Sequence, residues 1–286
     1  MQTMLASLID TSMKDENTIV NSIRELVQEA ILCGLGRGGF FDEAAFHGDT
    51  SLRIFHGLDR FSENLDFCLL DPSKELYLDK YRTYVEHELQ ALGLDMEIIT
   101  KGSDGPRPIS GGKVKGNMRD IMRVCGFDED TVHRMNPGTK LYIKFDIDTD
   151  TPQGFGIEHV YRTYPFCYPA TILDLPSLFA GKVGDVLTRQ YHNRVKGRDL
   201  YDFQWYIDNE VRLNVDYLRS NLLRGGFISE GDSFNKDIVI GMLHDRFETL
   251  DFQSAIDDVS RFIQNDSALY DWTPEYFIRL SNRLLT

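Results

Sequence analysis

Residues 140–148, KLYIKFDID, constrain the fold more than any other segment, because polar and apolar side chains alternate there without a break. A period of two places successive side chains on opposite faces of a β-strand. The apolar set can therefore pack in a core. The other face carries Tyr142, Lys144, Asp146 and Asp148. We predict a strand with one buried face and one charged face.

Other patterns before residue 170 are typical of an α/β protein. Apolar residues at helical spacing and short strand-like runs divide this part of the chain. The expected helices cover residues 17–33, 50–56 and 74–92, and the expected strands cover residues 44–47, 64–70, 96–100 and 155–164. The last of these strands is expected to pair with residues 140–148.

Two glycine-rich segments are expected to lie outside regular structure. Residues 34–39 should end the first helix, since a phosphate-binding loop would need a preceding strand and a GK[ST] ending. Residues 101–115 are rich in Gly, Ser and Pro and are expected to form a loop. Its basic cluster is either solvated or a flexible contact for phosphate. The cluster consists of Lys101, Arg107, Lys113 and Lys115, with Arg119 just beyond.

After Pro169 the pattern becomes helical. The expected helices cover residues 175–189, 199–207, 215–223, 234–250, 252–263 and 274–285. We therefore predict an α/β domain over residues 1–169, with a mixed sheet flanked by helices, and a helical C-terminal domain over residues 170–286.

The composition is that of a globular protein, with 286 residues, 42% hydrophobic and 27% charged. The formal net charge of −14 disfavours a non-specific nucleic-acid binder but leaves room for one basic groove. No apolar run approaches the roughly 20 residues of a membrane span. The four cysteines are far apart, without metal-binding spacing. We expect a cytoplasmic protein with reduced thiols and no membrane partner.

Acidic residues on two predicted strands are the strongest candidates for chemistry. Alternation places Asn64 and Asp66 on one face of their strand, as it does Asp146 and Asp148 on theirs. Two carboxylates about 4 Å apart repel by about 4 kcal/mol at an effective dielectric near 20. Mg²⁺ with a nucleotide phosphate would relieve that repulsion, because Mg²⁺ prefers oxygen ligands. The alternative is that these acids are simply solvated at strand ends.

Four segments in order resemble motifs of the AbiEii/AbiGii toxin family of nucleotidyltransferases. Residues 47–69, HGDTSLRIFHGLDRFSENLDFCL, are similar to the family's glycine turn and R-F-S-E-D-L-D-F strand. Residues 143–149, IKFDIDT, resemble its K-I-E-V-D-T strand. Residues 175–182, LPSLFAGK, resemble its lysine near a helix start, and residues 193–203, NRVKGRDLYDF, resemble its K-G-R-D-x-Y-D-F segment. Together the four motifs are specific.

The resemblance implies a nucleotidyltransferase-like fold and a role for each matching residue. Gly48 and Thr50 would hold the nucleotide phosphates through backbone N–H groups and the threonine hydroxyl. Asp66 and Asp146 would bind Mg²⁺ and act in catalysis. Lys182 would contact the triphosphate, or its side chain would simply reach water from an apolar helix.

Further roles are implied with a structural alternative for each. Asp199 would be a catalytic acid near the base or the acceptor, or a first-turn helix acid. Asn64 and Asp148 would complete the metal site. Arg53 and Arg198 would bind phosphate, unless they form ion pairs with nearby acids, which on a surface contribute under about 1 kcal/mol.

Two positions depart from the family pattern. Asn64 stands where the family has the first carboxylate of a D-x-D pair, so the metal site would lose one negative charge. Asp148 or Glu63 could replace it. The turn reads Gly48-Asp49-Thr50, and the Asp49 carboxylate would repel a triphosphate unless its side chain turns away.

Three hypotheses about function follow. The resemblance implies a Mg²⁺-dependent enzyme that transfers NMP from an NTP, such as GTP or CTP, to an acceptor hydroxyl on RNA or tRNA. It also implies a toxin of an abortive-infection, toxin–antitoxin system with a cognate antitoxin. The second hypothesis is a catalytically impaired nucleotide-binding or partner-binding relative, because of Asn64. The third is an interaction protein whose helical half docks a partner.

Overall fold

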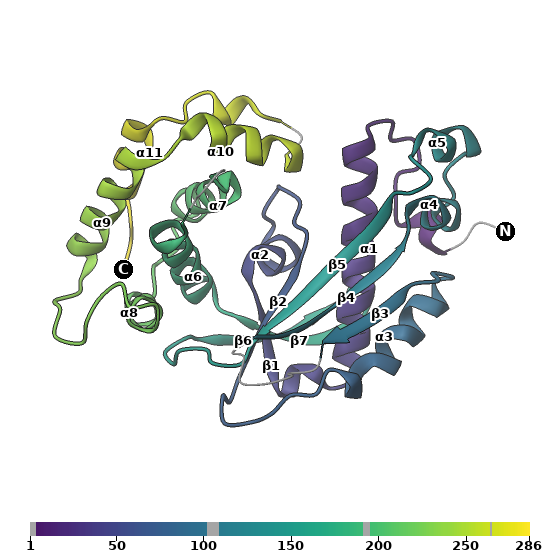
Figure 1. Ribbon diagram of the computed structural model, residues 1–286, viewed down its shortest axis with the longest axis horizontal. Coiled ribbons are helices and arrows are strands. Elements are labelled where there is room, and N and C mark those ends of the chain that lie inside the picture. The colour runs from purple at the N-terminus through teal and green to yellow at the C-terminus, as the bar shows by residue number, and fades with distance from the viewer. Residues whose placement is uncertain (1–3, 102–108, 191–194, 264) are drawn as a thin grey trace. The chain divides into compact units, whose positions relative to one another are not determined.

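The computed structural model describes residues 4–101, 109–190, 195–263 and 265–286 (Figure 1). Backbone contacts divide the chain into two compact units. The sheet unit comprises Met1–Ser51, Phe61–Thr151 and Glu158–Ile172. The helical unit comprises Leu52–Arg60, Pro152–Ile157 and Leu173–Thr286. That residues 1–169 and 170–286 are separate domains stays a prediction.

A mixed seven-stranded sheet forms the sheet unit, with the strand order β3-β4-β5-β2-β1-β7-β6. β2 pairs in parallel with β5 and antiparallel with β1, which pairs in parallel with β7. β4 lies antiparallel between β3 and β5. The strands are β1 (Ala44–His47), β2 (Leu65–Leu69), β3 (Glu97–Lys101), β4 (Ile109–Asn117), β5 (Lys140–Asp148), β6 (Ile157–Arg162) and β7 (Tyr168–Leu173).

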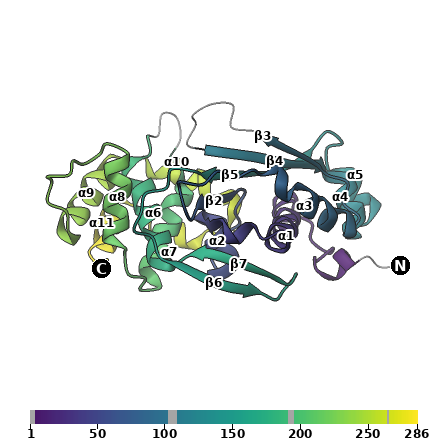
Figure 2. The same ribbon diagram turned by 90° about the horizontal axis from the view of Figure 1, so that it is seen from below.

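Helices cover one face of strands β3 to β5 (Figure 2). Helix α1 (Glu16–Arg37) packs against α3 (Asp79–Ala91). The apolar side of β5 is buried, with Leu141, Ile143 and Ile147 at most 1% exposed, and the polar residues between them stay accessible. The alternation thus gave the correct strand and the correct buried face. The predicted mixed α/β fold with flanking helices is confirmed.

Helix α1 continues through the glycines that were expected to end it. Gly34 and Gly36 lie within the helix, and Gly38 is its C-cap. A Cβ on Gly34 would lie 2.7 Å from the Val85 Cα, and one on Gly36 would lie 2.7 Å from the Pro169 carbonyl oxygen. These glycines therefore allow close backbone packing, a tertiary requirement that outweighs their low helix propensity.

The prediction of a loop over residues 101–115 was wrong for its second half. β4 (Ile109–Asn117) is a full strand that pairs with both β3 and β5. Gly112 fits in it because the Phe145 ring fills the space, and a Cβ there would lie 2.5 Å from the ring. Lys113 and Lys115 of the predicted basic cluster are therefore strand residues, whereas Arg107 lies outside the described residues.

The prediction that residues 155–164 pair with residues 140–148 was also wrong. β5 already has β4 and β2 as neighbours, and β6 lies at the sheet edge beside β7, a strand the sequence did not reveal. The connection between β6 and β7 is short, so their pairing costs little loop entropy. Two short helices were missed as well: α4 (Met118–Cys125), capped by the Asn117 side chain, and α5 (Glu129–Arg134).

The helical unit contains the helices expected after Pro169, packed around an aromatic core. Phe179 stacks on Tyr206 at 4.7 Å, and Phe277 lies 5.3 Å from both Phe247 and Phe252. The helices are α6 (Leu175–Thr188), α7 (Gly197–Asp208), α8 (Val215–Arg224), α9 (Lys236–Thr249), α10 (Phe252–Val259) and α11 (Pro274–Ser281). Short 3₁₀ helices span Met4–Ser7, Phe40–Asp42, Ser260–Phe262 and Ser267–Leu269.

Two observations bear on the expected environment of the protein. Within the described part of the chain, every helix is too short or too polar to cross a membrane. The four cysteines are free thiols, of which Cys33, Cys68 and Cys125 are buried and Cys167 is exposed.

Candidate functional site

A tight turn between β1 and helix α2 (Gly48–His56) lies at one end of the paired acidic strands. The helix starts directly after His47, which lies opposite Asp66 in the antiparallel β1–β2 pair. Gly48 has φ +77, a left-handed conformation that glycine adopts without strain. A Cβ at this position would lie 3.0 Å from the Asp66 carboxylate. Glycine is therefore needed for both the turn and the approach to Asp66.

Thr50 anchors this turn from the inside. Its side chain is 1% exposed, and its hydroxyl lies 2.8 Å from the Ser62 hydroxyl and donates to the Asn64 carbonyl. The start of α2 is thereby tied to the residue that precedes β2. The predicted contact between the Thr50 hydroxyl and a phosphate would require that hydroxyl to leave its protein partners.

Asp66 and Asp146 lie directly beside each other on neighbouring parallel strands. The register of β2 and β5 pairs Asp66 with Asp146 and Cys68 with Asp148. Partners in register point to the same face, which here is the polar face of β5. The structure thus brings together the two residues predicted to bind metal, although they are 80 positions apart in the chain.

The donor set fits one divalent metal ion held partly by a substrate. Two carboxylates side by side offer hard oxygen ligands, and Mg²⁺ in phosphoryl-transfer sites typically takes one or two carboxylates plus phosphate oxygens and water. No group of three or more His, Cys, Asp or Glu residues in the described ranges is arranged to hold a metal. The protein's share of the ligands would accordingly be Asp66 and Asp146.

Asn64 and Asp148 flank this pair. Asn64 is exposed immediately before β2, and Asp148 ends β5, where its side chain accepts from the Asp150 N–H at 3.0 Å. Burial and the nearby Asp148 charge raise the pKa of the Cys68 thiol to about 12. Cys68 therefore stays protonated and is not a nucleophile at this site.

Lys182 and Asp199 belong to a buried ionic network in the helical unit. The Lys182 ammonium lies 2.9 Å from Asp199 and 2.9 Å from Asp202. Arg60 donates two hydrogen bonds of 2.6 Å to Asp202, and Arg189 lies 3.1 Å from Asp199. Arg60, Asp199 and Asp202 are fully buried, and Lys182 is 5% exposed. The motifs gave Lys182 and Asp199 separate roles, and the structure brings the two side chains into contact.

Asp202 and Arg60 were not predicted as members of this network. Asp202 follows Asp199 by three residues on α7, a spacing that places both on one helix face and could have identified it. Arg60 lies within the first motif, residues 47–69, where no local spacing connects it with α7. Only the folded chain brings Arg60 to Asp202, which is 142 positions away.

The two arginines predicted to bind phosphate have protein partners. Arg53 donates to the Leu58 carbonyl at 2.9 Å. The Arg198 guanidinium lies over the Phe262 ring at 4.2 Å and 3.9 Å from the Asp258 carboxylate. Arg198 thus makes the ion pair that was the alternative interpretation. Phosphate binding by either arginine stays a prediction.

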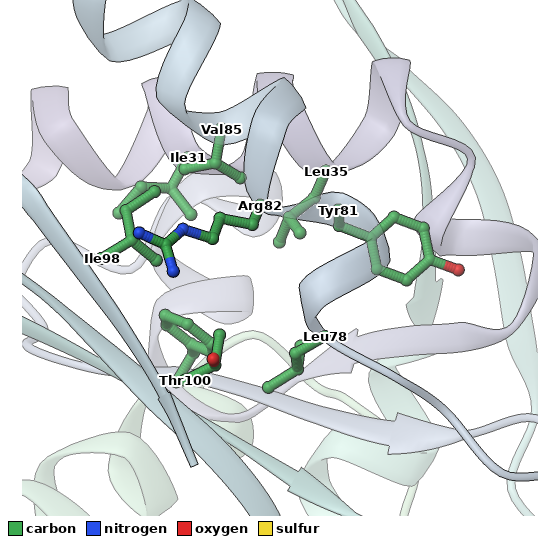
Figure 3. A pocket seen from close by; sticks show the side chains of 9 residues that line it. Ile31, Leu35, Leu78, Tyr81, Arg82, Val85, Ile98 and Thr100 are labelled. Atoms are coloured by element: carbon green, nitrogen blue, oxygen red, sulfur yellow. The ribbon is translucent and has the colours of Figure 1, made fainter. Parts of the chain in front are cut away.

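The sheet unit also contains an apolar crevice (Figure 3). It lies among α1, α3 and the sheet, and most of its lining is aliphatic or aromatic. The lining residues are Ile31, Leu35, Leu78, Tyr81, Arg82, Val85, Ile98, Thr100 and Phe145. It contains no convergent set of catalytic side chains, and we assign the candidate site to the Gly48 turn and the Asp66–Asp146 pair.

The four motifs and the acidic pair indicate the nucleotidyltransferase class, and comparison with family models agrees. Residues 30–273 match the model of the nucleotidyl transferase AbiEii toxin of type IV toxin–antitoxin systems. The chain therefore belongs to the AbiEii toxin family. Comparison with curated proteins gave no match.

Solved structures provide distant likenesses. JHP933 from Helicobacter pylori is 17% identical, over 95% of this chain and 90% of that one, with a TM-score of 0.47. MenT4, a nucleotidyltransferase toxin from Mycobacterium tuberculosis, is 12% identical, over 98% of this chain and 97% of that one, with a TM-score of 0.46. The family match alone supports the assignment above.

Proposed function

We propose that the protein transfers NMP from a Mg²⁺-bound NTP to a hydroxyl group of an RNA acceptor. The observation that supports this most is the register of β2 and β5, which sets Asp66 beside Asp146. Asp66 in turn lies against the Gly48 turn at the start of α2. Backbone N–H groups at a helix start favour phosphate, and paired carboxylates favour a divalent cation.

In this proposal the phosphates of the NTP bind at the start of α2, where Gly48 lets the backbone approach closely. Asp66 and Asp146 would hold Mg²⁺, which when bound neutralises charge on the transferring phosphate. The acceptor oxygen forms a bond to the α-phosphorus, and the bond from that phosphorus to the bridging oxygen breaks. Diphosphate leaves, and the hydroxyl proton passes to the exposed Asp146 carboxylate or to water.

Lys182 and Asp199 are proposed to act as one unit rather than independently. Each already holds the other at 2.9 Å in a buried environment, so a change at either alters both. Asn64 is proposed as an auxiliary ligand beside Asp66, whereas Asp148 would contribute its charge alone, because no third acid of the described ranges joins the pair in a metal-binding group. A cognate antitoxin is proposed as the partner, in keeping with the toxin–antitoxin description of the family.

Label transfer tests the proposal directly. Purified protein is incubated with Mg²⁺, total cellular RNA and each NTP in turn, labelled at the α-phosphate. We expect label on RNA with one NTP, loss of label with Asp66→Asn or Asp146→Asn, and retention with Asp95→Asn, a change at an exposed acid outside the site. Label that persists in both site variants would contradict the proposed role of the pair.

The second candidate, a nucleotide binder without turnover, is favoured by Asn64 in place of a family carboxylate. It predicts measurable Mg²⁺–NTP binding without transfer to RNA. Asn64→Asp should then raise metal affinity or start turnover, because it restores one negative charge. If Asn64→Asp changes neither metal affinity nor turnover, Asn64 lies outside the metal site. The hypothesis that Asn64 prevents turnover would then be wrong.

A further inference from the structure

The polar face of β4 and β5 bears a basic and aromatic surface that the proposed chemistry does not use. We call Lys113, Lys115, Lys140, Tyr142 and Lys144 the lysine face. The antiparallel register places Lys113 opposite Lys144 and Lys115 opposite Tyr142. All of these residues alternate with the buried apolar set and therefore point to the same side as Asp146.

The pair Lys113–Lys144 is unfavourable for the fold itself. Like charges directly opposite each other in an antiparallel sheet destabilise it. The Lys115 ammonium lies 2.7 Å from Glu97 of β3 and lowers the pKa of its carboxyl, with smaller contributions from Lys113 and Lys140. One carboxylate is thus shared among these three lysines, and the lysine face keeps an excess of positive charge that a polyanion could contact.

Tyr142 adds a feature suited to a nucleobase. Its ring is 45% exposed, and the Lys113 ammonium lies 5.9 Å from the ring centroid. Proteins that bind single-stranded nucleic acid combine exposed aromatic rings, on which bases stack, with lysines along the backbone path. One strand face carries both kinds of group here.

The lysine face begins next to the candidate metal ligand and extends away from it. Lys144, Tyr142 and Lys140 precede Asp146 in β5 and lie about 7, 13 and 20 Å from it, at roughly 3.3 Å per residue. Opposite Asp146 stands Gly111, where a Cβ would lie 2.8 Å from the Asp146 carboxylate. The absence of a side chain at Gly111 therefore lets the Asp146 carboxylate lie close to the β4 backbone.

We propose that the lysine face binds the single-stranded end of the nucleic-acid acceptor and directs its terminal hydroxyl toward Asp66 and Asp146. Lys113 and Lys144 contact backbone phosphates, and Tyr142 stacks on a base. This inference rests on the proposed function for the identity of the reacting end. The lysine face extends about 20 Å from Asp146 and includes the Tyr142 ring. An extended surface with an aromatic ring suits several nucleotides of a polynucleotide better than the compact triphosphate of one NTP.

The test measures binding separately from turnover. Fluorescence anisotropy of a labelled short single-stranded oligoribonucleotide gives its affinity at several salt concentrations. Lys113→Gln/Lys144→Gln should weaken binding roughly tenfold or more and lower the slope of log affinity against log salt by about 1.4, at about 0.7 per phosphate contact. Tyr142→Leu should weaken binding with little change of that slope.

A matched control has the same change in net charge. Lys14→Gln/Lys74→Gln alters two lysines whose side chains are 68% and 70% exposed and which lie outside the sheet strands. This control should keep both the affinity and the salt slope. Lys113→Arg/Lys144→Arg keeps the charge and should keep RNA binding. Thermal unfolding should show that the double glutamine variant is at least as stable as the native protein.

The outcomes separate this inference from the proposed function. Native RNA affinity and salt slope in Lys113→Gln/Lys144→Gln would overturn the inference, even if label transfer to RNA succeeds. A loss of Mg²⁺–NTP binding with unchanged RNA binding would also overturn it, because the lysines would then serve the triphosphate. Weakened RNA binding in this variant supports the inference, even if no NTP ever yields labelled RNA. Asp66→Asn should retain RNA affinity in every case.

Discussion

The carboxylates of the two units have opposite surroundings. In the sheet unit Asp66 has another carboxylate, Asp146, beside it, whereas in the helical unit Asp199 has the Lys182 ammonium beside it. Asp66 and Asp146 stand side by side with like charge on a polar strand face. Asp199 and Asp202 are fully buried, and Lys182, Arg60 and Arg189 contact them at 2.6–3.1 Å. The first arrangement is the one for which we propose a bound cation, whereas the second contains basic side chains of its own.

The two arrangements indicate two roles for charged residues in one chain, ligand binding and stabilisation of the fold. A like-charged pair on an accessible face costs stability, so its presence suggests a ligand. A balanced network in the interior holds elements together and is costly to interrupt, because removing one partner leaves a buried charge uncompensated. Family motifs named residues in both groups, and only the contacts in the folded chain distinguish them.

The largest expected effect on stability is at Arg60. Arg60→Met should lower the free energy of unfolding by about 3–5 kcal/mol, because the buried Asp202 loses both hydrogen bonds of 2.6 Å. Arg60→Met/Asp202→Leu removes the charge as well and should recover much of that loss, which urea denaturation can measure. If Arg60→Met and the native protein had equal free energies of unfolding, the buried network would not stabilise the helical unit, and the contrast with the Asp66–Asp146 pair would be wrong.

Substitution of Asp66 or Asp146 should lower activity without lowering stability, the reverse of what we expect for Arg60. Asp66→Asn and Asp146→Asn should each lower the rate of label transfer by roughly 10²–10³, the range seen when one electrostatic contact to a transition state is lost. Neither should lower stability, and relief of repulsion should raise it by about 0.2–1 kcal/mol. A drop in stability similar to that of Arg60→Met would mean that the pair is structural.

Glycine substitution tests how closely the turn must approach Asp66. Gly48→Ala should cost about 1–2 kcal/mol from the left-handed backbone, and its Cβ would in addition meet the Asp66 carboxylate at 3.0 Å. Gly57 has a similar φ of +79 with no atom within 4 Å of a Cβ. Gly57→Ala therefore isolates the backbone strain, and only Gly48→Ala should also reduce label transfer. Equal activities of the two variants would argue against the turn as a phosphate site.

The smallest expected effect is at Lys144. Lys144→Gln removes one charge from the pair with Lys113 and should stabilise the protein by about 0.2–1 kcal/mol. Thermal unfolding at low and high salt can measure this, because the gain should shrink as salt screens the repulsion. A loss of stability at both salt concentrations would mean that Lys144 has a favourable partner in the fold.

Local patterns predicted a large part of this structure. The range of β5, its buried face and the ranges of β1, β2 and most helices could be inferred from periodicity, which depends only on neighbours along the chain. The candidate site residues came from motif resemblance. The strand β4 was missed because its glycines resemble a loop until Phe145 fills the space beside Gly112.

The sequence by itself determined which strand faces are polar, where the acids lie on them, and that the chain is an AbiEii-family protein. Only the tertiary structure decided that Asp66 pairs with Asp146, that Arg60 reaches Asp202, and that Lys113 stands opposite Lys144. The physical reason is that alternation is set by the geometry of a single strand. Register and buried ion pairs instead depend on contacts between residues far apart in the chain, which no local pattern encodes.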